Sequence, residues 1–292
     1  MAGATPRARH TEFPGIARLR PRSMLFTLYG DYAYPRGVDL WLGSLVALGA
    51  RFHISEVAVR SAVARLSRDG WLVARREANR SYYALTERGR ALIEEGTERI
   101  YRPRRGAWNR RWCVLTYAIP EAQRARRDRL RKQLAWLGFG PLGGGAYISP
   151  NPVAAQAARL AAEHGVAGYA RIFEARFAGP VSADDLIRRC WNLERIGEQY
   201  DLFIKHYQPL CMRDAALRRK GKLSDAEAFV HRFALTHDFR RFPFIDPDLP
   251  AELLPRSWPG ARARELFETY HRSLSDGALA YFKSTAAAAR AA

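Results

Sequence analysis

Cysteine is scarce in this 292-residue chain, which has only Cys113, Cys190 and Cys211. Three widely spaced cysteines without a C-x-x-C pair predict buried thiols rather than disulfides or metal ligands. Long apolar runs are missing as well: none approaches the roughly 20 residues that span a bilayer, and the N-terminus has no apolar signal core. We therefore expect a soluble, cytoplasmic protein without a membrane partner.

The sequence also lacks catalytic motifs, with no G-x-S-x-G elbow, Walker loop or H-E-x-x-H helix. G-x-G-x-x-G does occur, from Gly138 to Gly143, but it leaves an expected helix and enters an expected strand. A dinucleotide site needs the reverse order. His231 and His237 are six residues apart on one expected helix, a net rotation of about 240°, so their imidazoles point away from each other. We expect no enzyme activity, no cofactor and no metal.

Acidic residues are few relative to basic ones: 29 Asp and Glu stand against 48 Lys and Arg, a formal net charge of +19. An excess of this size predicts attraction to a polyanion and says nothing by itself about the fold. Nucleic acid, an acidic membrane surface and anionic metabolites are all partners that such a charge could attract. The length allows two or three domains with buried cores.

The strongest functional signal lies between Ile54 and Tyr83. Ser55 is a preferred N-cap residue, and the apolar residues that follow it have the spacing of one buried helix face; they are Val59, Ala62, Val63 and Leu66. The opposite face is slim and flanked by cations, which suits a DNA major groove. Its residues are Ser55, Val57, Arg60, Ser61, Ala64, Arg65 and Arg68. A solvated surface helix is the other explanation of this pattern.

The flanking segments extend the same pattern. Residues Val38 to Gly49 predict a shorter helix before a tight connector, which gives a helix-turn-helix order. Two short strands, Trp71–Glu77 and Arg80–Leu85, predict a hairpin around Ala78-Asn79. Arg75, Arg76 and Arg80 gather near its tip, where a wing would meet the DNA backbone beside the groove.

The expected fold class is α+β. Residues 1–20 are expected to be a flexible basic arm, and residues 21–102 a winged-helix DNA-binding domain. This domain is expected to end in a helix from Thr86 to about Tyr101. An arginine-rich linker then marks the boundary to the next domain. Residues 103–180 predict a ferredoxin-like βαββαβ domain. Residues 181–284 are expected to form a helical C-terminal domain, with a capping box at Ser224. The alanine-rich tail, 285–292, is expected to fray.

The segments of the central βαββαβ domain follow from their apolar patterning. The expected strands are Trp112–Ile119, one around Phe139, Ala146–Ser149 and Tyr169–Phe177, and the expected helices are Glu121–Leu137 and Val153–Glu163.

Two motifs at opposite ends of the chain carry a family resemblance. They are Thr27-Leu28-Tyr29-Gly30-Asp31-Tyr32 with Pro35-Arg36-Gly37, and Asp246-Pro247-Asp248-Leu249-Pro250 followed by Leu254-Pro255 and Trp258-Pro259-Gly260. With the Val59-Arg60 helix and Asp69-Gly70-Trp71-Leu72, they resemble the PaaX family of transcriptional repressors of phenylacetic acid catabolism over about residues 20 to 283. The resemblance implies a winged-helix domain, a central Cas2-like domain, a helical C-terminal domain, a homodimer and phenylacetyl-CoA as inducer.

The resemblance to Cas2 raises a nuclease hypothesis. Such an enzyme needs carboxylates for a divalent metal near the end of the first strand, but Thr116, Tyr117 and Ala118 occupy it and Glu121 lies beyond Pro120. We therefore interpret the domain as a spacer or dimerisation unit.

An aryl-CoA effector needs cations for its phosphates and aromatic residues for its ring. The arginine run on the expected helix after Pro120 is either a solvated face, an effector site or an extension of the DNA footprint. The candidate effector residues are Arg124, Arg127, Arg131, Trp191, Tyr200, Phe203, Tyr207 and Trp258.

The sequence thus predicts a dimeric repressor of an aromatic-acid catabolic operon that binds a double-stranded DNA operator and is released by an aryl-CoA thioester. The alternatives are an acyl-CoA-processing enzyme with a basic domain and a nucleic-acid-binding protein without an effector. The missing nucleophile and metal motifs count against the first, and the helical C-terminal segment counts against the second.

Overall fold

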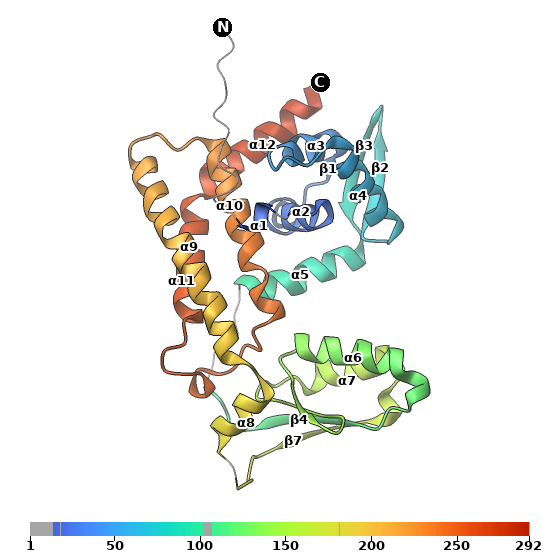
Figure 1. Cartoon of the computed structure of the whole chain (residues 1–292). Helices are drawn as coiled ribbons and strands as arrows, with labels where there is room; N and C mark the ends of the chain where they lie inside the picture. Colours follow the sequence, from blue (N-terminus) through green and yellow to red (C-terminus); the bar gives the residue numbers. More distant parts are fainter. Residues whose placement is uncertain (1–13, 18, 102–106, 181, 292) are drawn as a thin grey trace. The chain divides into compact units, whose positions relative to one another are not determined.

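The computed structural model describes residues 14–17, 19–101, 107–180 and 182–291, and it divides into two compact units (Figure 1). Of the described residues, those within 1–101, 204–240 and 264–292 form the first unit, and those within 102–203 and 241–263 form the second. A 27-residue helix, α9 (Leu193–Arg219), contributes to both. The expected C-terminal segment is therefore shared between the units rather than forming a unit of its own.

The first unit begins with short helices and a small sheet. Its N-terminal elements are α1 (Pro14–Ala17), α2 (Pro21–Leu28), the helical turns η2 (Tyr29–Ala33) and η3 (Tyr34–Arg36), β1 (Leu40–Trp41), α3 (Leu42–Ala50), α4 (Glu56–Arg68), β2 (Leu72–Glu77), β3 (Arg80–Leu85) and α5 (Glu87–Tyr101). Its C-terminal elements, besides α9, are α10 (Asp225–Phe239), α12 (Ser275–Ala291) and the part of α11 (Gly260–Ser273) that begins at Arg264.

The strands of the first unit form a three-stranded antiparallel sheet in the order β1-β3-β2. The expected hairpin is confirmed, and Ala78 in its turn has a positive φ of 51°. The expected helix from Val38 is partly wrong: Leu40 and Trp41 are paired with Tyr83 and Tyr82, so α3 begins only at Leu42. A short segment that supplies strand hydrogen bonds to β3 cannot also start a helix.

Helix α10 is the centre of the first unit, with Phe229 and Phe233 fully buried. It contacts α1, α2 and α12, and α12 also contacts α3. The expected capping box at Ser224 is confirmed, since Ser224 and Glu227 exchange both hydrogen bonds.

Both ends of the described chain contain helix where the sequence predicts an arm or a fraying tail. Residues 14–17 of the expected arm form α1, whose Ile16 is buried, while residues 1–13 and 18 lie outside the described part of the chain. The tail from Thr285, which we expect to fray, belongs to α12, which runs to Ala291, and Ser44 donates a hydrogen bond to the Ala286 carbonyl at 3.4 Å. Alanine has the highest helix propensity, so this segment extends the helix that packs on α3.

The second unit contains the expected βαββαβ order. Its elements are β4 (Trp112–Tyr117), the turn η4 (Glu121–Gln123), α6 (Arg124–Trp136), β5 (Gly140–Gly143), β6 (Ala146–Ser149), α7 (Ala154–Glu163), the turn η5 (Ala167–Tyr169) and β7 (Ala170–Ala175). The sheet order is β5-β6-β4-β7 with every neighbour antiparallel, which is the ferredoxin-like arrangement. Leu115, Leu130 and Leu134 belong to its hydrophobic core.

The motif Asp246-Pro247-Asp248-Leu249-Pro250 packs on the ferredoxin-like elements, which explains why residues 241–263 belong to the second unit. Asn151 Nδ2 donates to the carbonyls of Pro247 and Asp248 at 3.2 Å. Gly138, at a φ of +84°, passes so close to the Pro247 carbonyl that a Cβ atom would lie 2.4 Å from it. Gly138 thus makes a tight turn from α6 toward β5, the reverse of a dinucleotide motif, as the sequence predicts. The remaining elements of this unit are α8 (Ala183–Cys190), η6 (Phe242–Phe244) and η7 (Ala251–Leu253).

All three cysteines are free; Cys113 and Cys190 are buried, as expected, and Cys211 is half-buried. Among the described residues, none of the helices is both long and apolar enough to cross a membrane.

Candidate nucleic-acid interface

The candidate interface is built on α4, whose local structure agrees with the sequence. The Ser55 hydroxyl accepts a hydrogen bond from the Ala58 amide at 3.3 Å and caps the helix. Val59, Val63 and Leu66 are buried against the rest of the first unit, in which α4 contacts α2, α3 and β2. This packing fixes which face of α4 points to solvent.

The outward face of α4 is exposed as expected. Val57 is the most exposed large apolar side chain in the described residues, at 77%. Arg60 Nε donates to Glu56 Oε1 at 2.7 Å, an i,i+4 ion pair on the same face. The other exposed members of this face are Ser55, Ser61, Ala64, Arg65 and Arg68. Small and cationic side chains can approach a groove closely and donate to guanine or phosphate oxygens.

The hairpin arginines differ in their surroundings. Arg75 forms ion pairs with Asp39 at 3.3 Å and with Glu77 at 2.6 Å. The Arg80 guanidinium lies 5.1 Å from the Trp41 ring centroid. Arg76 is exposed. Arg76 therefore has the fewest competing contacts among these three arginines. The charge of Arg75 is partly neutralised by Asp39 and Glu77.

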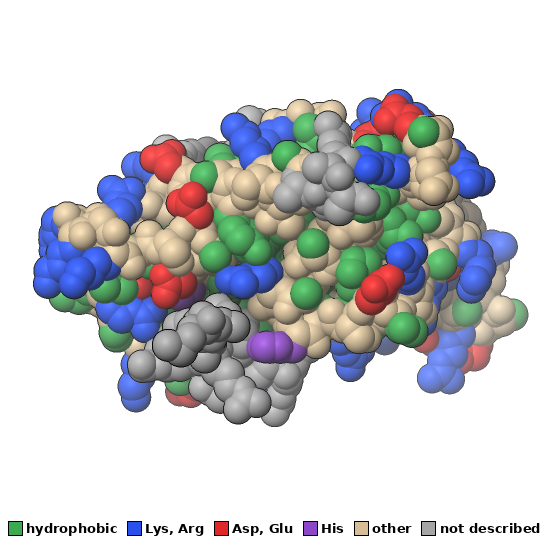
Figure 2. All heavy atoms as spheres, turned by 90° about the horizontal axis from the view of Figure 1, so that it is seen from above, with side chains coloured by type: hydrophobic (Ala, Val, Ile, Leu, Met, Phe, Trp, Pro, Cys, Tyr) green, Lys and Arg blue, Asp and Glu red, His purple; other side chains and the backbone are tan. Residues whose placement is uncertain are grey.

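Two further arginines lie beside the C-terminal end of α4 and are absent from the sequence prediction. Arg22 of α2 pairs with Asp69 at 3.8 Å. The Arg88 guanidinium stacks 4.0 Å from the centroid of the Trp71 ring and donates to the Asp69 carbonyl at 3.2 Å. Their positions depend on tertiary contacts, so helix periodicity around Ser55 gives no signal for them. Over the face drawn in Figure 2, Lys and Arg side chains gather in several groups among fewer Asp and Glu.

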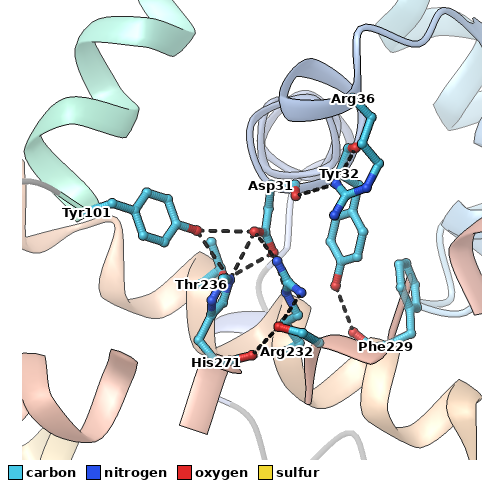
Figure 3. A network of polar contacts seen from close by, with 9 residues as sticks. Asp31, Tyr32, Arg36, Tyr101, Phe229, Arg232, Thr236 and His271 are labelled. Atoms are coloured by element: carbon cyan, nitrogen blue, oxygen red, sulfur yellow. Dashed lines mark hydrogen bonds and ion pairs between the residues drawn. The ribbon is translucent and has the colours of Figure 1, made fainter. Parts of the chain in front are cut away.

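A buried polar network connects the first motif of the chain to its C-terminal helices. Arg232 donates to both oxygens of Asp31, at 3.1 and 2.8 Å, and His271 Nε2 lies 2.9 Å from Asp31 Oδ1. The hydroxyls of Tyr101 and Thr236 donate to the same carboxylate at 3.1 and 3.3 Å (Figure 3). We call these five residues the Asp31 network. It joins η2, α5, α10 and α11 within the first unit.

The carboxyl of Asp31 stays ionised in this site. Burial alone would raise its pKa, but His271 and Arg232 hold the pKa well below its usual range. Asp214 behaves alike: burial opposes ionisation, while hydrogen bonds from His231 and Tyr270 lower its pKa. Both carboxylates are therefore more stable ionised in the folded chain than in the unfolded one.

We expect acid to destabilise the protein. Because both folded-state pKa values are depressed, the stabilisation is complete above the unfolded pKa of about 4 and is lost as the pH falls below it. Urea unfolding at pH 7, 4 and 3 measures this effect, with the free energy of unfolding falling between pH 4 and pH 3. A free energy of unfolding that stays constant down to pH 3 would contradict the lowered pKa values of Asp31 and Asp214.

The two histidines of α10 have separate roles, as the sequence predicts. His231 Nδ1 lies 2.5 Å from Asp214 Oδ2, whereas His237 Nδ1 lies 3.1 Å from the Thr27 hydroxyl. In the described part of the chain, no group of three or more His, Cys, Asp or Glu side chains is arranged to hold a metal ion.

The aromatic residues proposed for an effector are mostly packed against each other. Tyr200 is stacked on Phe242 with centroids 3.9 Å apart, and Trp258 and Phe203 meet this pair edge-on. Trp191 lies against Gly140. Tyr207 belongs to the other unit, where its hydroxyl donates to Asp238 at 2.7 Å.

The three arginines proposed for the effector phosphates pair with acids near them in sequence. Arg124 and Arg127 bind Glu121, and Arg131 lies 3.9 Å from Asp128. A cavity of about 350 Å³ beside α6 is lined by Arg126, Arg129, Ala162, Glu163, His164 and Gly165. None of the eight candidate effector residues lines this cavity.

Comparison with known proteins identifies the family. Models of the PaaX-like protein, the central Cas2-like domain and the PaaX-like C-terminal domain match residues 20–89, 105–187 and 191–284. The chain is 35% identical to the transcriptional repressor PaaX of Escherichia coli strain K12 over 265 residues, which are 89% of this chain and 82% of that protein. The chain therefore belongs to the PaaX family.

A solved structure supports the fold. The uncharacterized protein Rv0674 from Mycobacterium tuberculosis matches with a TM-score of 0.57 at 26% identity, covering 89% of this chain and 97% of that one. The likeness extends over both compact units. The match to a central Cas2-like domain agrees with the ferredoxin-like sheet order of the second unit.

Proposed function

We propose that this protein is a transcriptional repressor of a phenylacetate-type catabolic operon. The observation that carries the proposal is the exposed, capped and cation-flanked outward face of α4 in a chain that is 35% identical to a transcriptional repressor. Family membership favours a regulator over an acyl-CoA-processing enzyme. The net charge of +19 supplies the general attraction to DNA.

In the proposed complex, α3, α4 and the β2–β3 hairpin act as a winged helix-turn-helix. Helix α4 enters the major groove, with Arg60, Ser61 and Arg65 nearest the base edges. The hairpin, with Arg76 at its exposed side, contacts the flanking phosphates. A homodimer would place two copies of α4 in successive major grooves of an inverted repeat.

Selection from a random pool of DNA duplexes tests this proposal. Repeated capture on the full chain is expected to enrich an inverted repeat whose half-sites are about one helical turn apart. A pool that stays random after repeated rounds would contradict sequence-specific binding. Enrichment of a single half-site would contradict the dimeric arrangement alone. The enriched duplex is called the operator below.

The proposed inducer is an aryl-CoA thioester that favours a conformation with low affinity for the operator. The Asp31 network gives α10 and α11 a direct connection to the elements that support α4. The aromatic cluster around Tyr200 is closely packed, so an aryl group can enter only if Phe242 or Trp258 moves. The ligand then has different affinities for the closed and the opened packing, as a population shift requires.

Phenylacetyl-CoA is expected to bind the free protein more tightly than the operator complex, because a ligand shifts an equilibrium only by its differential affinity. Phenylacetate lacks the nucleotide phosphates and should bind far more weakly. Calorimetry with both compounds, with and without operator, measures the difference. Equal release of DNA by the free acid, or thioester affinity that the operator leaves unchanged, would contradict the mechanism.

A further inference from the structure

An acidic residue lies on the face of α4 that we propose to meet DNA. Glu56 is the first residue of the helix, directly after the Ser55 cap, and 56% of its side chain is exposed. Its Oε1 accepts the Arg60 Nε hydrogen bond at 2.7 Å. A carboxylate here is unexpected on electrostatic grounds alone, because it repels the phosphates that the surrounding arginines attract.

Fold stability does not account for the ion pair. Both partners are more than half exposed, and exposed i,i+4 pairs contribute little to folding. Glu56 also lies in the first turn of α4, where a negative charge is favourable with or without Arg60. Neither fold stability nor the helix dipole therefore requires the bond to Arg60.

The bond restricts the guanidinium that is best placed to contact a base. Because Arg60 donates to Glu56 through Nε, the bond favours one orientation of the long Arg60 side chain, and its Nη1 and Nη2 groups remain for other acceptors. Two donors in a planar fork match the O6 and N7 atoms of guanine. An arginine that is already oriented loses less conformational entropy when it binds.

We propose that Glu56 is a positioning residue for sequence recognition, which rests on the proposed function of α4. It orients Arg60 for a guanine edge, and its charge weakens binding to duplexes where Arg60 finds only phosphate. Both effects act on the ratio of operator affinity to random-duplex affinity. Discrimination against wrong partners by repulsion is a general route to specificity.

Replacing Glu56 by glutamine tests the proposal, because it removes the charge and keeps the shape. We expect tighter binding of a random duplex by about fivefold, the scale of one like-charge contact, and an operator-to-random ratio that falls about tenfold. The melting temperature should stay nearly unchanged. Glu265→Gln, the same charge change at an exposed position of α11, is the matched control and should leave the ratio unaltered.

A double-mutant cycle separates positioning from charge alone. In an Arg60→Ala background, Glu56→Gln should lower the ratio less than in the wild type, since no arginine remains to be oriented and only the effect of the charge is left. If the wild type discriminates between the duplexes but Glu56→Gln leaves the ratio within twofold, the positioning role is wrong and the proposed function stands. A wild type that does not discriminate would overturn both.

Discussion

Replacing Asp31 by alanine is expected to lower the free energy of unfolding by about 3–5 kcal/mol. Asp31 is 5% exposed, and its carboxylate accepts hydrogen bonds from Arg232, Tyr101 and Thr236. Without it, the Arg232 guanidinium, itself buried, remains without its charged partner in a medium that solvates it poorly. Urea unfolding at pH 7 measures the loss.

Two variants control this prediction. Asp69→Ala removes an exposed partner of Arg22 and should cost less than about 1 kcal/mol. Asp31→Ala in an Arg232→Met background should cost much less than in the wild type, because no buried charge is left unpaired. A loss below about 1 kcal/mol for Asp31→Ala alone would show that the Asp31 network does not hold the first unit together.

Replacing Arg60 by alanine is expected to weaken operator binding by about 1–3 kcal/mol, which is roughly 5- to 150-fold. The reason is the loss of a bidentate donor at a base edge, so binding to a random duplex should change much less. Arg262→Ala, at an exposed position of α11, removes the same charge and serves as the control. Fluorescence anisotropy with both duplexes measures the two affinities.

The salt dependence separates the two roles that Arg60 can have. If Arg60 contacts only phosphate, its replacement by alanine would weaken binding to both duplexes alike. It would also reduce the slope of log affinity against log salt by about one. Equal losses on operator and random duplex for Arg60→Ala would therefore place Arg60 on the DNA backbone and contradict base recognition.

The sequence predicts features that depend on residues close together in the chain. The Ser55 cap, the buried face of α4 and the capping box at Ser224 are each set within one or two helical turns. The β2–β3 hairpin and the βαββαβ order also follow from local patterning. These are the parts of the fold that the structure confirms.

Contacts between distant segments could not be predicted in this way. Asp31 and Arg232 are 201 residues apart, and no local pattern relates them. Helix α1 packs on α10, and α12, which extends through the expected tail, packs on α3. Pairing with β3 converts Leu40 and Trp41 from expected helix to strand.

In the candidate site, too, local features could be predicted from the sequence and contacts between distant segments could not. Helical periodicity identifies the outward face of α4 because a helix repeats its faces regularly. It does not reveal that Asp39 and Glu77 pair with Arg75. Aromatic residues such as Tyr200 have the same spacing whether they line a ligand site or fill a core, and here Tyr200 is stacked on Phe242.

The most direct test of the central claim is a titration of the wild-type chain with operator and with random duplex at two salt concentrations. Recognition through α4 predicts operator affinity at least about 10³-fold higher than random-duplex affinity, with both falling steeply as salt rises. Equal affinities for the two duplexes at both salt concentrations would contradict the assignment of this protein as a sequence-specific repressor.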